Sequence, residues 1–217
     1  KLAGVNKDTK DVNGGLIVRD SAGNPTGVFK DAAMNYFYSA IPAPSWDERM
    51  ESAQAATDHA ASLGVTSVQD MSAGSDIGIY QELLRQGKLK TRVYGCSTLT
   101  DYKRWSNTGV RYAFGNAMLR VGCLKGYADG SLGSTTAWLF EPYLDDPKST
   151  GLAGEDIPKT PELVLAADKA GLQINIHAIG DKANATILDI YEQTAKTNGP
   201  RDRRFRIEHA QHLRQQD

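Results

Sequence analysis

The chain of 217 residues can bury a substantial core, and its 25 basic and 26 acidic side chains give a formal net charge of −1. This balance leaves no basic field for nucleic acid or for an acidic membrane surface. No stretch approaches the roughly 18 apolar residues of a membrane span. We therefore expect neither a nucleic-acid partner nor a membrane partner.

The first part of the chain is expected to form a hairpin and a helix. Two short extended runs, residues 16–19 and 26–29, flank the turn-rich segment DSAGNP, which is typical of a β-hairpin. A helical pattern follows in DAAMNYFYSAI and ends at Pro42 and Pro44. We expect residues 1–44 to be an insertion within a larger domain, whose α/β part occupies residues 45–217.

From residue 45 onwards, helical and strand-like segments alternate. The segment SWDERMESAQAATDHAASLG predicts a helix with Ser45 as N-cap, Glu48 completing a capping box and Gly64 after the last turn. Short apolar runs rich in Val and Ile, separated by helical patterns, are typical of parallel βαβ units. The predicted strands are VTSVQDM, TRVYGCS, MLRVGCLKGY, LQINIH and RFRIEH.

Two α/β architectures fit this alternation, an open doubly wound sheet and part of a TIM-type (β/α)8 barrel. Neither a G-x-G-x-x-G turn nor a P-loop occurs, which disfavours the nucleotide-binding forms of these folds. The chain begins at Lys1 without Met and ends just after the fifth strand, so we expect a fragment. Five barrel strands would leave two open edges, through which we expect a homodimer or another association.

The two cysteines, Cys96 and Cys123, lie in separate strand-like runs and form no C-x-x-C motif. We predict buried free thiols rather than a disulfide or a cysteine zinc site. The expected compartment is the cytoplasm, although a signal peptide upstream of Lys1 would be compatible with this sequence.

Residues with metal-binding or acid–base chemistry stand where the predicted strands end, the edge at which a parallel α/β fold collects its active-site groups. Asp70 ends the first strand and Lys125 lies near the end of the third. His177 and His209, two of only four histidines, end the fourth and fifth strands. Because imidazole is the commonest metal ligand, we interpret these two histidines as candidate ligands.

Lys125 lies inside the apolar run VGCLKGY, where the desolvation cost of an ammonium is large unless it is neutralised or paired. Four interpretations stay open: a lysine that snorkels to the rim, a Schiff-base lysine, a base of depressed pKa, and a carbamylated lysine that bridges two metal ions. The Schiff-base form would indicate a lyase. A non-catalytic or partner-stabilised domain is the remaining alternative.

Five phrases of the sequence resemble, in their expected order, the metal-dependent amidohydrolase superfamily, and within it the family 3 branch that includes N-substituted formamide deformylases. This resemblance implies hydrolysis of an amide-like C–N bond of a small-molecule substrate, other than a peptide bond, by water activated on one or two divalent metal ions, zinc above all. The phrases are GGLIVRDSAGNPTGVFKDAA, LGVTSVQDM, LKGYADGSLGSTTAWLFEPYLDDP, INIHAIGDKAN and RIEHAQ.

The resemblance also implies that the chain covers approximately strands two to six of the barrel. Lys125 would be the carbamylated bridging ligand on strand four, and His177 and His209 would bind one metal ion from strands five and six. The long connection over residues 128–159 would shape or cover the pocket. The family's H-x-H pair and its proton-accepting aspartate on strand eight have no counterpart in this sequence. We therefore assign no catalytic residue and expect the fragment alone to be inactive.

Overall fold

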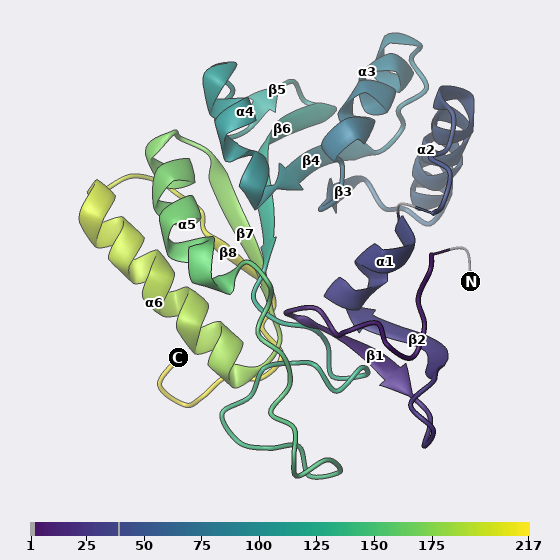
Figure 1. The fold of residues 1–217 in the computed structure, drawn as a ribbon. Helices are drawn as coiled ribbons and strands as arrows, with labels where there is room; N and C mark the ends of the chain where they lie inside the picture. The colour runs from purple at the N-terminus through teal and green to yellow at the C-terminus, as the bar shows by residue number, and fades with distance from the viewer. Residues whose placement is uncertain (1–2, 39) are drawn as a thin grey trace.

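The computed structural model describes residues 3–38 and 40–217 and shows a curled parallel sheet flanked by helices (Figure 1). Sheet order follows chain order, and each of the five main strands is parallel to its neighbour. This half-barrel confirms the predicted partial (β/α)8 architecture. Its strands are β3 Ser67–Asp70, β4 Arg92–Thr98, β6 Leu119–Tyr127, β7 Gln173–Ala178 and β8 Arg206–His209, with the short β5 Phe114–Gly115 antiparallel to β6.

The helices lie between consecutive strands, as the alternating sequence pattern predicts. The capping box at Ser45 and Glu48 is confirmed, because each residue's side chain accepts the other's backbone N–H. None of the helices in the described ranges is long and apolar enough to cross a bilayer. The helices are α2 Trp46–Ser62, α3 Ile77–Arg85, α4 Tyr102–Asn107, α5 Thr160–Lys169 and α6 Asp181–Asn198, with 3-10 turns η2 Gly74–Asp76, η3 Leu99–Asp101 and η4 Ile157–Lys159.

The predicted hairpin is confirmed, with β1 Gly15–Arg19 antiparallel to β2 Pro25–Asp31. The carboxylate of Asp20 closes its turn by accepting the backbone N–H of Asn24 at 2.8 Å. The helix predicted after it is shorter than expected. It consists of the 3-10 turn η1 Ala32–Met34 and the single turn α1 Asn35–Tyr38, and the next residue lies outside the described ranges.

The main core lies between the convex face of the sheet and helices α5 and α6. Leu124 on β6 and Ile174 on β7 have no exposed surface and pack with Val164 of α5 and Ile187 of α6. Each fully buried aliphatic side chain of this kind contributes roughly 1.5–3 kcal/mol. Successive strand residues point to opposite faces. Lys125, which follows Leu124, therefore faces the concave side of the half-barrel.

The structure shows a disulfide between Cys96 and Cys123, so the prediction of free thiols is wrong. The two cysteines are register partners on the neighbouring strands β4 and β6, with Cα atoms 4.4 Å apart, which is within the range that a disulfide spans. Cysteine spacing carries no information about strand register, and for that reason the sequence did not reveal the pairing.

Candidate metal centre

The two candidate histidines lie together at the carboxyl edge of the half-barrel. In the register of β7 and β8, Ala178 pairs with His209, so His177 and His209 are one residue apart in height. Their ring centres are 4.6 Å apart in an edge-to-face arrangement. A zinc–nitrogen bond of about 2.0 Å places a ligand ring centre roughly 3 Å from the ion, so both rings can reach one metal ion.

The backbone turns sharply at His209, where the strand ends. His209 and Ala210 have φ values of 82° and 45°, which side-chain-bearing residues rarely adopt and which cluster at functional sites. Burial lowers the pKa of His209, and the neighbouring His177 and Lys125 lower this pKa further. Both effects favour the neutral imidazole, the form that binds a metal.

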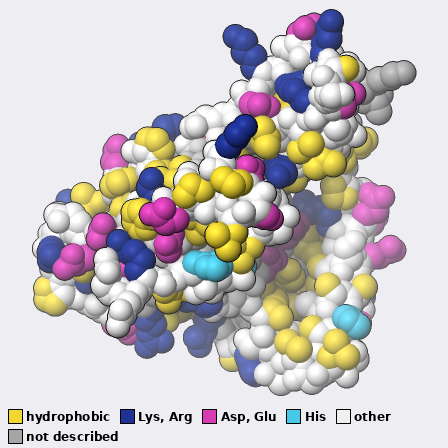
Figure 2. All heavy atoms as spheres, turned by 90° about the horizontal axis from the view of Figure 1, so that it is seen from below, with side chains coloured by type: hydrophobic (Ala, Val, Ile, Leu, Met, Phe, Trp, Pro, Cys, Tyr) yellow, Lys and Arg dark blue, Asp and Glu magenta, His cyan; other side chains and the backbone are white. Residues whose placement is uncertain are grey.

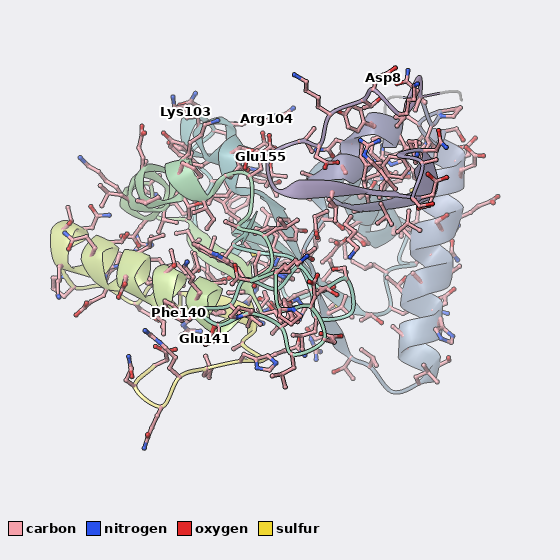
Figure 3. The ribbon with its side chains drawn as sticks, turned by 60° about the horizontal axis from the view of Figure 1, so that its bottom comes forward. Asp8, Lys103, Arg104, Phe140, Glu141 and Glu155 are labelled. Carbon is pink, nitrogen blue, oxygen red and sulfur yellow. A yellow bond between two sulfur atoms is a disulfide. The ribbon has the colours of Figure 1, made fainter. Side chains whose placement is uncertain are left out.

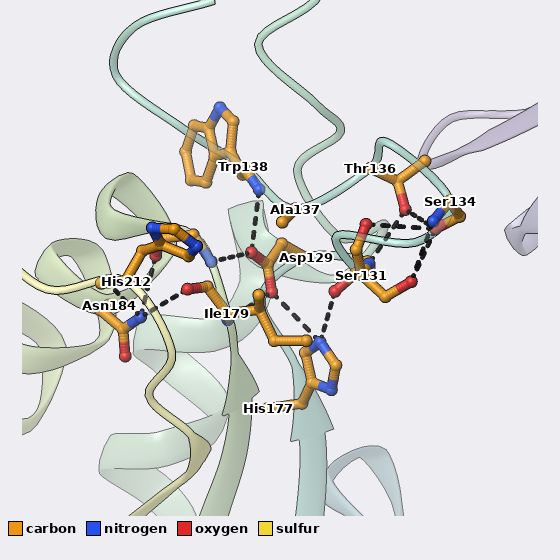
Figure 4. A network of polar contacts seen from close by, with 12 residues as sticks. Asp129, Ser131, Ser134, Thr136, Ala137, Trp138, His177, Ile179, Asn184 and His212 are labelled. Atoms are coloured by element: carbon orange, nitrogen blue, oxygen red, sulfur yellow. Dashed lines mark hydrogen bonds and ion pairs between the residues drawn. The ribbon is translucent and has the colours of Figure 1, made fainter. Parts of the chain in front are cut away.

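Hydrogen bonding determines which nitrogen of His177 is available to a metal ion. Its Nε2 lies 2.7 Å from the carbonyl oxygen of Gly130 and 3.2 Å from Oδ1 of Asp129 (Figure 4). Both neighbours are acceptors, so Nε2 carries the proton and donates. In the neutral form of this ring, Nδ1 has the lone pair and is the nitrogen that can coordinate a metal ion.

Lys125 is 5% exposed and lies on the concave face beside Asn175, its register partner on β7. Its Nζ is 4.6 Å from the ring centre of Tyr127, and no carboxylate of the described residues forms an ion pair with it. Burial lowers the pKa of Lys125 to about 8, although Glu208 opposes this shift. An appreciable share of the neutral, nucleophilic amine is therefore present at mildly alkaline pH.

The lowered pKa of Lys125 predicts a pH-dependent stability. Between the folded value of about 8 and an unfolded value of about 10.4, the unfolded chain binds more protons. The contribution of this lysine to the free energy of unfolding therefore rises with pH across this interval. At pH 7, Lys125→Met should raise the free energy of unfolding of the metal-free, CO2-free protein by roughly 1–2 kcal/mol, because it removes a buried ammonium.

Urea denaturation at pH 7 and at pH 10 measures this effect. Most of the gain from Lys125→Met should be lost at pH 10, where the wild-type lysine is neutral. The exposed Lys103 on α4 provides the control, and Lys103→Met should change the free energy of unfolding by the same amount at both pH values. An equal gain from Lys125→Met at both pH values would contradict the prediction.

The donor set is small. Within residues 3–38 and 40–217, no three His, Cys, Asp or Glu side chains come together as a metal site. Two imidazoles are present at the candidate centre, and the nearby side chain outside this set that could add a third ligand is Lys125. The adjacent amide of Asn175 is fully buried, and its Oδ1 has no hydrogen-bond partner. Two imidazoles and an amine that can be converted into an anion fit a divalent metal ion.

The loop over residues 128–159 forms one wall beside this centre. It is fixed to α6, beside which Phe140 lies in Figure 3. The backbone N–H of Phe140 donates to Asp181 at 3.0 Å, and Lys182 Nζ lies 4.7 Å from the Trp138 ring centre. A cavity of about 400 Å³ separates the loop from the N-terminal segment. Its lining includes Asp31, Tyr38, Tyr127, Gly130 and Glu155.

Two residues of the site were not predicted from the sequence. The ring of Tyr127 faces both the cavity and His177, at 5.6 Å between ring centres. The sequence indicated Tyr127 indirectly, because it lies two residues after Lys125 and both side chains are therefore on one face of the strand. The second residue is Asp129, which contacts His177. It was not predicted, because an aspartate in the segment DGS is equally typical of a turn. Asp70, by contrast, accepts the Tyr80 hydroxyl at 2.7 Å and stabilises the structure locally.

The chain matches the amidohydrolase family model over residues 1–217. It is 40% identical over 230 residues to the protein LONG AFTER FAR-RED 3 of Arabidopsis thaliana and 32% identical over 219 residues to the putative amidohydrolase YtcJ of Bacillus subtilis. These matches cover 98% of this chain but 39% and 40% of the relatives. N-substituted formamide deformylase of Arthrobacter pascens is 26% identical over 222 residues, which cover 96% of this chain and 40% of that protein.

Solved structures of two uncharacterised metal-dependent hydrolases are also similar. The one from Pyrococcus horikoshii has a TM-score of 0.76 at 30% identity, over 91% of this chain and 39% of that chain. The one from Pyrococcus furiosus has a TM-score of 0.75 at 29% identity, over 97% of this chain and 42% of that chain. The chain thus spans about two fifths of the length of the relatives it matches. On this evidence the chain belongs to the amidohydrolase family, in its family 3 branch.

Proposed function

We propose that this chain contributes the metal-binding half of a hydrolase that cleaves an amide-like C–N bond, other than a peptide bond, in a small molecule. The observation that carries the proposal is the convergence of His177 and His209 beside Lys125 at the carboxyl edge of the half-barrel. The printed names of the relatives, which include a putative amidohydrolase, a formamide deformylase and metal-dependent hydrolases, support the same reaction class.

In this proposal, Nδ1 of His177 and the imidazole of His209 hold a divalent ion, with zinc preferred for two neutral imidazoles. A bound ion of this kind lowers the pKa of water towards ~7 and polarises a substrate carbonyl. The neutral Lys125 amine forms an N–C bond with CO2 and releases a proton. The resulting carbamate anion would add an anionic oxygen ligand to the two imidazoles.

The cavity of about 400 Å³ beside Tyr127 is the substrate pocket in this proposal. Tyr127 connects the pocket to the centre, because its ring contacts both Lys125 and His177. A substrate held there would place its scissile bond at the carboxyl edge of β6 and β7. Acidic and basic side chains are interspersed on the face shown in Figure 2, which agrees with a small-molecule substrate rather than a polyanion.

Metal content tests the proposed function. After equilibration with Zn²⁺ and bicarbonate and removal of free ions, elemental analysis should find stoichiometric zinc in the wild-type protein. Lys125→Ala and His177→Ala should lose it, whereas His59→Ala, which removes an exposed histidine of α2, should retain it. Unchanged zinc content in both site variants would refute the metal centre. A ¹³C carbamate signal that disappears with Lys125→Ala would identify the modified lysine.

A lysine-dependent lyase is the second candidate, and the lowered pKa of Lys125 favours it. In that reaction the neutral amine condenses with a substrate carbonyl and releases water, forming a Schiff base. Borohydride should then trap a covalent adduct on Lys125 in the absence of metal. Zinc binding without any trapped adduct would favour the hydrolase.

A further inference from the structure

The buried carboxylate of Asp129 joins two segments that are far apart in the sequence (Figure 4). Its side chain has no exposed surface. Oδ2 accepts the backbone N–H groups of Trp138 at 2.9 Å and Gly180 at 2.8 Å, and Oδ1 accepts that of Ile179 at 3.0 Å. One side chain therefore fixes the loop after β6 to the turn that follows His177.

The same carboxylate reaches the candidate metal ligand. Oδ1 of Asp129 lies 3.2 Å from Nε2 of His177, and the carbonyl oxygen of the next residue, Gly130, lies 2.7 Å from the same nitrogen. Both oxygens are acceptors, so they hold the proton on Nε2 and direct Nδ1 away from the loop. A flipped ring would turn a C–H group towards both oxygens and lose the hydrogen bond.

Three backbone N–H groups donate to Asp129, and Nε2 of His177, which is hydrogen-bonded to the Gly130 carbonyl, lies 3.2 Å from its Oδ1. A carboxylate can satisfy all of them, because its two oxygens offer about four acceptor sites and no donor. An asparagine has one acceptor oxygen, and its NH2 group would face N–H donors. The arrangement therefore calls for aspartate.

The position of Gly130 is fixed independently. Its backbone N–H donates to the carbonyl of Thr136 at 3.1 Å, and the hydroxyl of Thr136 accepts the N–H of Ser131 at 3.0 Å. A Cβ atom at position 130 would collide with the Thr136 side chain. The loop thus presents its carbonyl and the neighbouring carboxylate as one rigid acceptor pair.

We propose that Asp129 is a positioning residue that fixes the tautomer and the orientation of His177 while anchoring the loop that walls the cavity. The inference rests on the proposed metal centre, in which His177 is a ligand. Partners of this kind orient a metal-bound imidazole, and their loss typically costs 10–100-fold in metal affinity. Asp129 itself lies behind the histidine and does not touch the reacting atoms.

The first test is a ¹H–¹⁵N NMR spectrum of the metal-free protein at neutral pH. The chain has four histidines, and the His177 signals are identified by their loss in His177→Asn. We expect His177 in the Nε2–H tautomer. A wild-type ring in the Nδ1–H tautomer would overturn the proposal, whether or not the protein binds metal.

The second test compares Asp129→Asn with Asp181→Asn. Asp181 is the matched control, because its carboxylate also accepts a loop N–H, that of Phe140, but does not touch His177. In Asp129→Asn we expect a mixture of His177 tautomers and a zinc affinity 10–100-fold weaker by competition titration. In Asp181→Asn we expect the wild-type tautomer and the wild-type zinc affinity.

Equal losses in Asp129→Asn and Asp181→Asn would show that Asp129 only stabilises the loop and would overturn the proposal. A wild-type tautomer that persists in Asp129→Asn would also overturn it. If Asp129→Asn does not fold, Asp129→Ser, which keeps an acceptor oxygen in less space, takes its place. A wild-type protein that binds no zinc would refute the proposed function, while the NMR comparison would still decide the role of Asp129.

Discussion

Replacing Asp168 with alanine should lower the free energy of unfolding by about 3–5 kcal/mol, because it leaves buried charge without a partner. Asp168 is on α5, and its side chain has no exposed surface. Its Oδ1 lies 3.1 Å from Nε of Arg203, a side chain that is 9% exposed, and 3.3 Å from Nη2 of Arg201. Asn198, at the end of α6, donates to its Oδ2 at 2.9 Å. This cluster fixes the segment that leads into β8 and therefore supports His209.

Urea denaturation of Asp168→Ala measures this loss. The control is Asp202→Ala, which breaks an exposed ion pair with Arg204 and should cost less than about 1 kcal/mol. Similar small losses in the two variants would show that the cluster is dispensable. The double variant Asp168→Leu with Arg203→Leu should be more stable than Asp168→Ala, because it removes the more buried of the two guanidinium groups that Asp168→Ala leaves unpaired.

Removing the disulfide with Cys96→Ala and Cys123→Ala should lower the free energy of unfolding by about 3–4 kcal/mol in the chain-entropy model. The two residues are separated by 27 positions, so the crosslink closes a loop that contains the end of β4, α4, β5 and the first part of β6. Both side chains are buried, and Asn175 donates to Sγ of Cys123 at 3.0 Å. The crosslink thus lies directly below Lys125 on the concave face.

Thiol labelling checks the disulfide first. Protein denatured in iodoacetamide without reductant should show no labelled cysteine by mass spectrometry, and two labelled cysteines would contradict the crosslink. Dithiothreitol should then lower the urea midpoint of the wild-type protein. The double alanine variant serves as the control, because its midpoint should not respond to dithiothreitol.

The partial barrel could be predicted because its determinants are local. Alternating helix and strand periods indicate βαβ units, and parallel strands bring their carboxyl ends to one edge. That rule placed His177 and His209 close together from their positions in the sequence alone. The capping box at Ser45 is equally local, since it depends on two residues three positions apart.

The remaining features depend on contacts between distant segments. The Cys96–Cys123 pair follows from strand register, and the contacts of Asp129 follow from the path of a loop that returns to β7. The helical segment after Asp31 is shorter than its composition predicts. At its start, the φ of 50° at Asp31 interrupts the regular backbone between β2 and η1. The division at residue 44 and association through the edges β3 and β8 stay predictions.

The register between β6 and β7 sets how far the side chain at position 125 must reach. Lys125 is level with Asn175, whereas His177 is level with Tyr127. The lysine Cα therefore lies two residues, or roughly 6–7 Å, deeper in the half-barrel than that of the histidine. In the proposed centre, a lysine lengthened by a carbamate would span this depth, whereas an aspartate or glutamate at the same position would end below the imidazoles. Strand depth would then explain why the proposed site uses a lysine that can be modified, because a shorter carboxylate side chain would supply the negative charge without the length.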